Sequence, residues 1–381
     1  MSEGNGSGVA AELSDINRRL QHNADALQLL FRGAEADRRR PLTDAMAAAE
    51  AAMTHANDSA SPDTVWAESV EPSPDGPVVF LDLIGTPEQN RSWLSAFTEE
   101  LTRAGWSGTL APAPIPPPSE WVSGLDTAIR PAGYLAFRMN EEPPPGTVGR
   151  WGPPRWTVDA GTTTALCRYL VGWAALPGAT VQLTMGRSRS EFSGDDVAEH
   201  LVWAAEHNHT AGVAYTAPAA ARLADLGAWG QVTCQVRDDG PDWRARVEHL
   251  RELLLEFANQ LDVAFLRTGR YPVTSWTGLA GAVPALPHVS EAKVNRYRRL
   301  WDQYVPDAHG IQILTAAHLS RLGPLPDWEV RPLTGGGHLV QARDLEPWFA
   351  AAEPDPEVVA AARADFAGAL LTPEVISAAG G

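Results

Sequence analysis

The chain has 381 residues, 44% of them hydrophobic, which suits one large domain or two to three ordinary ones and allows a sizeable core. The formal net charge is −17 at pH 7, and most of it lies in residues 1–77, with 13 acidic and 6 basic residues, and in residues 344–381, with 7 acidic residues and 1 basic residue. The body between them is nearly balanced and has no broad basic field, which excludes a protein that binds nucleic acid by neutralising its phosphates.

The N-terminal residues 1–10 are expected to form a flexible tail. They are polar, and without a basic start or an apolar run they do not read as a signal peptide. The sequence contains no run of about 18 apolar residues, so we expect no membrane-spanning helix and no membrane partner. These patterns predict a cytoplasmic protein. A single lysine, Lys293, among many Ala, Gly and Pro residues is typical of a GC-rich bacterial genome.

Two helices are expected next. Apolar residues recur at helical spacing over residues 12–31, and an alanine-rich stretch follows Pro41 over residues 42–57. Together these helices would form an N-terminal arm, residues 1–57, that could join copies of the chain into a homo-oligomer. Residues 58–77 contain four prolines among Ser and Asp, which predicts a linker.

The body is expected to have two halves. In the first, residues 78–225, we expect strands at 78–83, 133–139 and 179–185 and helices at 88–104, 162–176 and 195–207. In the second, residues 226–350, we expect strands at 231–236 and 263–266, helices at 242–261, 290–305 and 313–322, and a final hairpin. Residues 351–381 add a helix at 353–370 and a tail. This order predicts an α+β fold with antiparallel or mixed sheets and packed helices, in two related β-α-β-β halves.

Several expected helices carry an apolar stripe that should face the core. The stripes are Trp93, Phe97 and Leu101; Leu166, Leu170 and Trp173; and Trp243, Val247, Leu250, Leu254, Phe257 and Leu261. The two cysteines, Cys167 and Cys234, are too few for a disulfide framework and are expected to be small buried hydrophobic residues.

The run Thr334-Gly-Gly-Gly-His338 could suggest a phosphate-binding loop. Such a loop lies between a strand and the N-terminus of a helix, because the helix amides and dipole hold the anion. Here the strand-like stretches 330–333 and 339–342 flank the glycines, and no Gly-Lys-Ser or Gly-Lys-Thr follows. The glycines are therefore predicted to form the turn of a β-hairpin.

The candidate metal ligands are His200, His207 and His209. On a helix, His200 and His207 would lie two turns, about 10 Å, apart, whereas a metal ion needs ligands about 2.0–2.2 Å away. The spacing favours a solvated helix face, and we expect no metal and no other cofactor. No Gly-x-Ser-x-Gly elbow occurs, and adjacent carboxylates such as Asp238 and Asp239 point in different directions, so the sequence assigns no catalytic residues.

Many of the 14 tryptophans fall in expected loops beside Gly, Pro and Arg. This composition is typical of protein-contact hot spots. The predicted interface consists of Trp151, Trp156, Trp276, Asp238 and Asp239. The alternative is that these tryptophans only cover the core beneath long loops.

Two segments carry a resemblance to a known family. Asp307-Ala-His-Gly-Ile-Gln-Ile-Leu-Thr-Ala-Ala-His-Leu-Ser-Arg-Leu-Gly323 and Val330-Arg-Pro-Leu-Thr-Gly-Gly-Gly-His-Leu-Val-Gln-Ala342 are similar to the closing part of the bacterial type VI secretion immunity-protein family. There, a helix ending in Leu-Gly precedes a glycine hairpin, and the resemblance covers mainly residues 290–347. It implies a non-catalytic protein that binds and neutralises a cognate toxin.

The leading hypothesis is therefore a protein-binding factor that occludes a toxin. Two alternatives stay open. One is an enzyme, such as a metal-dependent hydrolase, whose site is assembled from distant residues including His200, His207 and Asp195. The other is a component of a larger assembly that oligomerises through residues 12–57.

Overall fold

A computed structural model describes residues 9–11, 16, 26–33, 40–57, 65–71, 73, 75–83, 86–113, 129–138, 160–185, 188–191, 194–206, 211–227, 231–238, 242–270, 300–351 and 353–379. The chain divides into two compact units. The first is Met1–Pro117 with Ser188–His200, and the second is Pro118–Arg187 with Leu201–Gly381. The boundaries expected at residues 57, 77, 225 and 350 do not coincide with this division.

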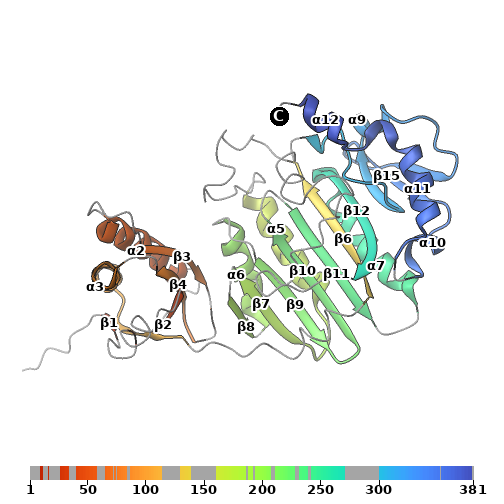
Figure 1. Ribbon diagram of the computed structural model, residues 1–381. Helices are drawn as coiled ribbons and strands as arrows, with labels where there is room; N and C mark the ends of the chain where they lie inside the picture. The colour runs from red at the N-terminus through yellow and green to blue at the C-terminus, as the bar shows by residue number, and fades with distance from the viewer. Residues whose placement is uncertain are drawn as a thin grey trace, which may run out of the picture. The chain divides into compact units, whose positions relative to one another are not determined.

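Among the described residues of Met1–Pro117, the first unit forms a five-stranded mixed sheet and the helices α2 and α3 (Figure 1). Its strands are β1 (Val9–Ala11), β2 (Ala26–Gly33), β3 (Val65–Glu71), β4 (Val78–Leu83) and β5 (Gly108–Pro112), in the order β1-β5-β2-β4-β3. β1 is parallel to β5, and the other neighbours are antiparallel. The helices α2 (Arg40–Asn57) and α3 (Pro87–Arg103) pack against each other.

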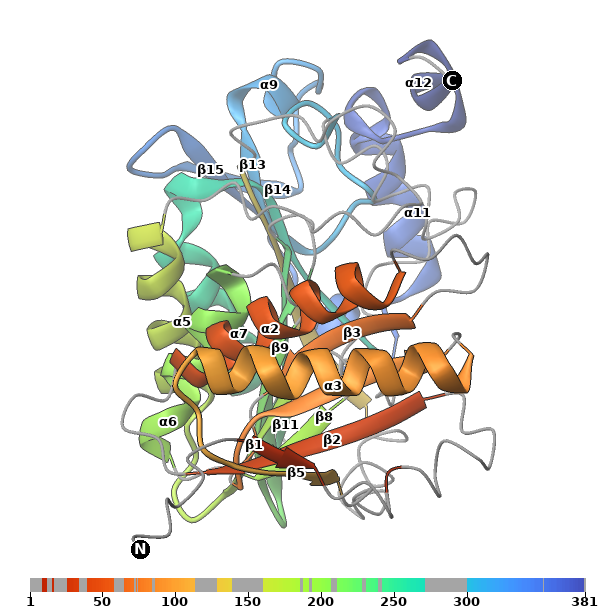
Figure 2. The same cartoon turned by 90° about the vertical axis from the view of Figure 1, so that its left-hand side faces the viewer.

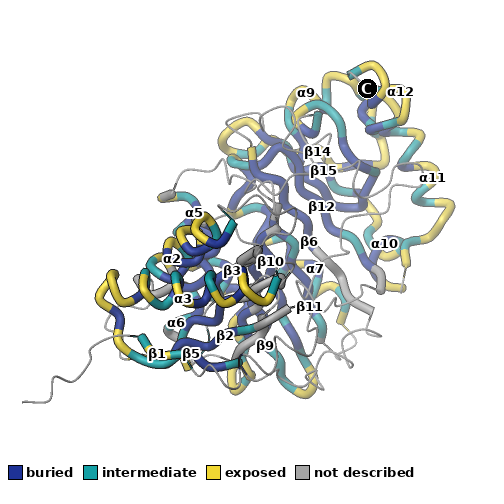
Figure 3. Tube along the Cα trace, turned by 60° about the vertical axis from the view of Figure 1, so that its left-hand side comes forward, coloured by how far each residue is buried: buried dark blue, intermediate teal, exposed yellow. Residues whose placement is uncertain are grey.

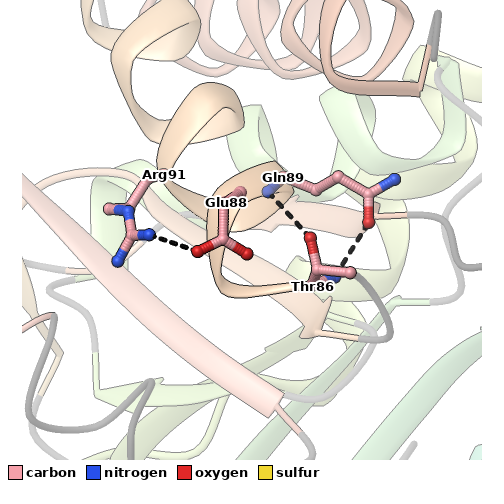
Figure 4. A network of polar contacts seen from close by, with 4 residues as sticks. All are labelled: Thr86, Glu88, Gln89 and Arg91. Carbon is pink, nitrogen blue, oxygen red and sulfur yellow. Dashed lines mark hydrogen bonds and ion pairs between the residues drawn. The ribbon is translucent and has the colours of Figure 1, made fainter.

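The start of α3 shows how local sequence fixes a helix end. The Thr86 side chain accepts a hydrogen bond from the Gln89 backbone N–H, and the Gln89 side chain accepts one from the Thr86 N–H (Figure 4). This capping box satisfies two amides that would otherwise lack partners. Further along α3, Trp93, Phe97 and Leu101 are buried, as their spacing predicts.

Two expectations for the first unit are wrong. Residues 26–31 are not helical, because β2 pairs with both β4 and β5 inside the sheet. Residues 65–71 are not a linker, because they form β3 at the sheet edge next to β4. The described residues before β4 therefore supply β1, β2 and β3 to the sheet. Of the two expected helices, the second forms α2, and of the first the described Ile16 is helical.

The larger sheet has ten strands in the order β14-β15-β13-β12-β6-β11-β10-β9-β7-β8, and every pair with a described register is antiparallel. The strands are β6 (Ile129–Phe137), β7 (Thr180–Met185), β8 (Ser188–Glu191), β9 (Ala211–Ala217), β10 (Ala220–Gly227), β11 (Gln231–Asp238), β12 (Leu261–Arg270), β13 (Ile311–Thr315), β14 (Trp328–Pro332) and β15 (Gly337–Ala342). The helices are α5 (Ala160–Ala174), α6 (Gly194–Glu206), α7 (Trp243–Glu256), α9 (Ala316–Leu319), α10 (Glu346–Phe349), α11 (Pro356–Asp365) and α12 (Pro373–Ala378).

One face of this sheet packs against helices. A Cβ atom placed on Gly133 would lie 3.3–3.4 Å from side-chain atoms of Leu250, Leu254 and Leu266, so β6 and α7 are in close contact there. Figure 2 shows α5 and α7 on the same side of the sheet, and α5 contacts β9 and β10. The burial of Leu250 and Leu254 is the main apolar contribution of α7 to this core.

The helix α11 covers the other side of the sheet near β14. Phe366, which ends α11, meets Trp328 edge-on at 4.9 Å between ring centroids. The Trp328 indole N–H donates to the Asp365 carboxylate at 2.9 Å. Figure 2 shows α11 on the opposite side of the sheet from α5 and α7. In Figure 3, β12 is buried along most of its length, whereas much of α11 is exposed.

The three glycines form the hairpin turn that the sequence predicts. Gly335 and Gly336 have φ values of 100° and 98°, and β14 and β15 pair on either side of them. The Leu333 N–H donates to the Gly337 carbonyl at 2.8 Å, which closes the turn. Glycine adopts positive φ without the steric cost that a Cβ imposes.

The fold is α+β, as the order of elements predicts. Residues 313–315 are a strand rather than the start of a helix, because β13 pairs with β12 and β15. The described part of the expected helix at 290–305 forms a turn at 300–303. Within the described ranges no helix is long and apolar enough to cross a membrane.

Candidate functional site

An open groove of about 420 Å³ lies beside α7 in the second unit. We call it the α7 groove. Its lining is Trp243, Arg244, Val247, Glu248, Arg251, Ile311, Gln341, Arg343, Asp344, Leu345 and Glu346. One wall is the first three turns of α7, and the other is formed by β13, β15 and the start of α10.

The sequence of α7 explains which side chains reach the groove. Asp242 caps the helix by accepting a hydrogen bond from the Arg244 N–H at 3.0 Å. Arg244, Glu248 and Arg251 then follow at steps of four and three, so they share one stripe of the helix. The apolar stripe with Leu250 and Leu254 faces the sheet. The groove therefore receives the charged stripe of an amphipathic helix.

An aromatic and cationic pair stands at one end of the groove. The Arg244 guanidinium carbon lies 4.4 Å from the centroid of the Trp243 ring, and that ring stacks on Phe349 of α10 at 6.3 Å. Arg244 also approaches Glu346 at 3.7 Å, but both side chains are about two-thirds exposed, so this pair contributes little stability. Trp243 is half-buried rather than a core residue, which corrects the expectation from its place in the apolar stripe.

A second arginine is held within the groove wall. Arg251 donates two hydrogen bonds to the Glu248 carboxylate, at 2.8 and 2.7 Å. This bond to Arg251 lowers the pKa of Glu248 below its usual value and raises that of Arg251. The pair is fixed in position and presents charges of both signs at the surface.

The third arginine, Arg343, has spare hydrogen-bonding capacity. Its Nε donates to the Pro326 carbonyl at 3.0 Å, and it forms no ion pair with the described residues. The neighbouring Asp344 accepts a hydrogen bond from the Glu346 N–H at 3.0 Å and so helps to start α10. Arg343 can therefore receive a carboxylate or carbonyl oxygen from outside the chain.

The structure describes only one of the five residues predicted to form the interface. Trp151, Trp156, Trp276 and Asp239 lie outside the described residues. Asp238 is the last residue of β11, opposite Ala220 of β10. The α7 groove contains none of these five residues.

His200 does not lie on the solvated helix face that the spacing of the histidines favours. His200 is buried within α6, with 6% of its surface exposed, while His207 and His209 lie outside the described residues. Among the described residues no group of three or more His, Cys, Asp or Glu side chains could hold a metal ion. Cys167 and Cys234 form no disulfide and are fully buried, as expected.

One local pattern in the sequence predicts part of the groove. An acidic cap followed by Trp-Arg, with charged residues recurring on one stripe, marks the exposed side of α7. The opposite wall carries no such local signal, because Ile311 reaches Gln341 only through the pairing of β13 with β15. We compared the chain with protein-family models, with curated proteins and with solved structures, and none of them matches it.

Proposed function

We propose that this chain is a non-catalytic protein-binding factor and that the α7 groove is its contact surface. The observation that carries the proposal is the lining: one half-buried tryptophan and three arginines in an open groove. Tryptophan and arginine dominate the energetics of protein interfaces, because they combine large contact area with directed hydrogen bonds.

Charge supports a particular class of partner. The groove alternates three arginines with three acidic residues, so it favours a surface that also alternates in sign. The chain as a whole has a net charge of −17, which accelerates encounter with a basic protein. The proposed partner is therefore a basic protein that places a carboxylate or carbonyl oxygen near Arg343.

Toxin neutralisation is the finer form of the proposal. The segments that resemble the type VI secretion immunity-protein family, residues 307–323 and 330–342, contain Ile311 and Gln341 of the groove wall. A partner seated there would have the covered part of its own surface closed to substrate, which is inhibition by occlusion. The cytoplasmic location expected from the sequence would suit a factor that protects its own cell.

Co-expression tests this proposal directly. The chain would be produced together with each toxin encoded beside its gene, and growth would be measured. We expect rescue by the wild-type chain and by the control Arg91→Glu, whose exposed partner Glu88 lies on α3 of the first unit. The double variant Trp243→Ala with Arg343→Glu should lose rescue.

Binding of the purified toxin, measured by calorimetry, should weaken at least a hundredfold in the same double variant. Circular dichroism would verify that the variant is folded. The absence of rescue by the wild-type chain for every linked toxin, or equal binding by the double variant, would contradict the proposal.

A further inference from the structure

The strand β14 forms one edge of the larger sheet. It is the last strand in the sheet order and pairs with β15 on one side. Val330 lies at its centre and is 41% exposed, and among the described residues it is the one large hydrophobic residue that is exposed. An edge strand presents backbone groups to which a further strand can bond.

The hydrogen bonds of the hairpin show which backbone groups face the open edge. At one end of β14, the Leu333 N–H donates to the Gly337 carbonyl at 2.8 Å. At the other end, the Arg343 N–H donates to the Asp327 carbonyl at 3.0 Å. Bonded and non-bonded residues alternate in an antiparallel pair, so the odd-numbered residues of β14 bond to β15. Val330 therefore directs its own N–H and C=O towards the open edge.

The stretch that can accept a further strand is short. The Trp328 N–H, which also faces the edge, donates to the Leu325 carbonyl at 3.2 Å. Pro332, at the other end, has no N–H to donate. Backbone hydrogen bonding at this edge is therefore centred on Val330.

Two charges of opposite sign flank Val330. Glu329 and Arg331 are its neighbours in β14, and their side chains lie on the face of the sheet opposite to that of Val330. Both are exposed, and neither forms an ion pair in the part of the chain that the structure describes. The edge thus carries the sequence acid, apolar residue, base, which is complementary to its own reverse.

We propose that this edge pairs with the same edge of a second copy of the chain, antiparallel and centred on Val330. Each Val330 then exchanges its N–H and C=O with the Val330 of the other copy. Glu329 of each copy lies directly opposite Arg331 of the other, in the closely spaced kind of pair in which side chains interact most. The two ten-stranded sheets join edge to edge in a symmetric dimer.

This dimer does not rest on the proposed protein partner, because none of Val330, Glu329 and Arg331 lines the α7 groove. The contact is one short strand, and we expect it to bury less than the roughly 1,200 Å² of stable complexes. The dimer should therefore exchange with the monomer and form at high protein concentration. Salt should weaken it, because exposed charge pairs are screened.

Sedimentation equilibrium of the full chain over a wide range of protein concentration tests for the dimer. We expect a monomer–dimer equilibrium for the wild type. Glu329→Arg makes both flanking charges basic and Arg331→Glu makes both acidic, so each variant should self-associate about tenfold more weakly. An equal mixture of the two should associate again, because each acid then faces a base. The control Arg91→Glu makes the same charge change on α3 and should associate like the wild type.

Cysteine cross-linking tests the register. The native Cys167 and Cys234 are fully buried, so an added surface thiol can be oxidised selectively. Val330→Cys places two Cα atoms about 5.5 Å apart in the dimer, within the range of a disulfide. Thr334→Cys, in the exposed hairpin turn, lies roughly 26 Å from its copy at about 3.3 Å per residue. Mild oxidation should give covalent dimers of Val330→Cys and none of Thr334→Cys.

The wild-type chain alone can overturn the proposal. A monomer at every protein concentration would contradict it. Glu329→Arg and Arg331→Glu variants that each associate like the wild type would place the contact elsewhere, for example at residues 1–57, and would also contradict it. Equal cross-linking of Val330→Cys and Thr334→Cys would rule out this register.

Discussion

The two faces of the larger sheet carry different kinds of side chain. On the face under α7, the buried side chains include Leu135 of β6 and Leu266 of β12, and the helix adds Leu250 and Leu254. Next to these on the same strands, but pointing the other way, Tyr134 stacks on Phe265 at 5.0 Å. The alternation of side chains along β6 and β12 therefore separates an apolar face from a mixed one.

The mixed face contains buried polar groups that have no hydrogen-bond partner among the described residues. Gln312 lies opposite Phe265, is fully buried, and has no hydrogen-bond partner for either amide atom. His309 stacks on Phe265 at 4.0 Å, and its Nε2 atom also has no partner. A buried polar group without a hydrogen-bond partner lowers the free energy of unfolding. The apolar face therefore stabilises the unit, whereas the unpaired polar groups of the mixed face destabilise it.

The largest expected effect is on the apolar face. Leu254→Ala should lower the free energy of unfolding by about 2–5 kcal/mol, because it removes a fully buried side chain between α7 and β6. Urea unfolding followed by tryptophan fluorescence would measure the change. The neighbouring Leu255 is only half-buried, and Leu255→Ala should cost clearly less. Equal losses in the two variants would contradict the packing of α7 described above.

The mixed face should make stability depend on pH. Burial lowers the pKa of His309 to about 4, and nearby Arg267 and Arg363 oppose the smaller effect of Asp307. The unfolded chain binds a proton near pH 6.5 and the folded chain does not, so His309 stabilises the fold above that pH. This contribution is lost as the pH falls from about 6.5 towards 4, at up to about 1.4 kcal/mol per unit.

Unfolding experiments between pH 7 and 4.5 would measure this dependence. His309→Gln should show a shallower loss of stability than the wild type over that range. His318, whose pKa burial also lowers to about 4, titrates in both proteins, and the pKa of Asp225, which burial raises well above its usual value, acts in the opposite direction in both. Their contributions cancel in the difference, so parallel pH profiles would show that His309 is not held neutral by the fold.

Removing a polar group from the mixed face should not destabilise the protein. Gln312→Leu replaces two unpaired amide atoms by methyl groups of similar volume, and we expect the free energy of unfolding to stay level or rise by about 1–3 kcal/mol. Gln341→Leu, on β15 and lining the α7 groove, is the control and should change stability by less than about 0.5 kcal/mol. A clear loss of stability in Gln312→Leu would mean that the amide has partners that matter.

Local patterns predicted the fold where an element had one apolar stripe. α3, α5 and α7 appear where the spacing of their buried residues places them. The sequence favours a helix for the segment of β2, because Leu27 and Leu30 also fit a helical stripe. Only its pairing with β4 and β5 shows that it is a strand. β9 and β10 were not expected, since their alanine-rich sequence around Pro218 has weak strand preference.

The candidate sites were harder to predict than the fold. Arg343 and Trp243 are 100 positions apart in the sequence, and only the ordering of strands brings them to one groove. The open edge at Val330 carries no local signal either, because it depends on β14 being the last strand in the order of the sheet.

The smallest expected effect concerns how α11 is held near the mixed face. Arg363 of α11 donates two hydrogen bonds to Asp307, at 2.8 and 2.6 Å, where leucines hold α7. Burial is the largest single influence and raises the pKa of Asp307. The hydrogen bonds from Arg363 and the Ala308 N–H, together with the charges of His309 and Arg363, outweigh it, so the pKa is lowered. Arg363→Ala leaves a mostly buried carboxylate without its cation and should cost about 1–2 kcal/mol, limited because Arg363 is 40% exposed.

This loss should be specific to an ion pair with one buried member. Arg91→Ala breaks the largely exposed pair with Glu88 and should cost less than about 0.5 kcal/mol. Asp307→Asn should recover part of the loss in the Arg363→Ala background, because the amide needs no cation. If the double variant were as unstable as the sum of the two single variants, the pair would not be coupled, and α11 would be held by its aromatic contact between Phe366 and Trp328 instead.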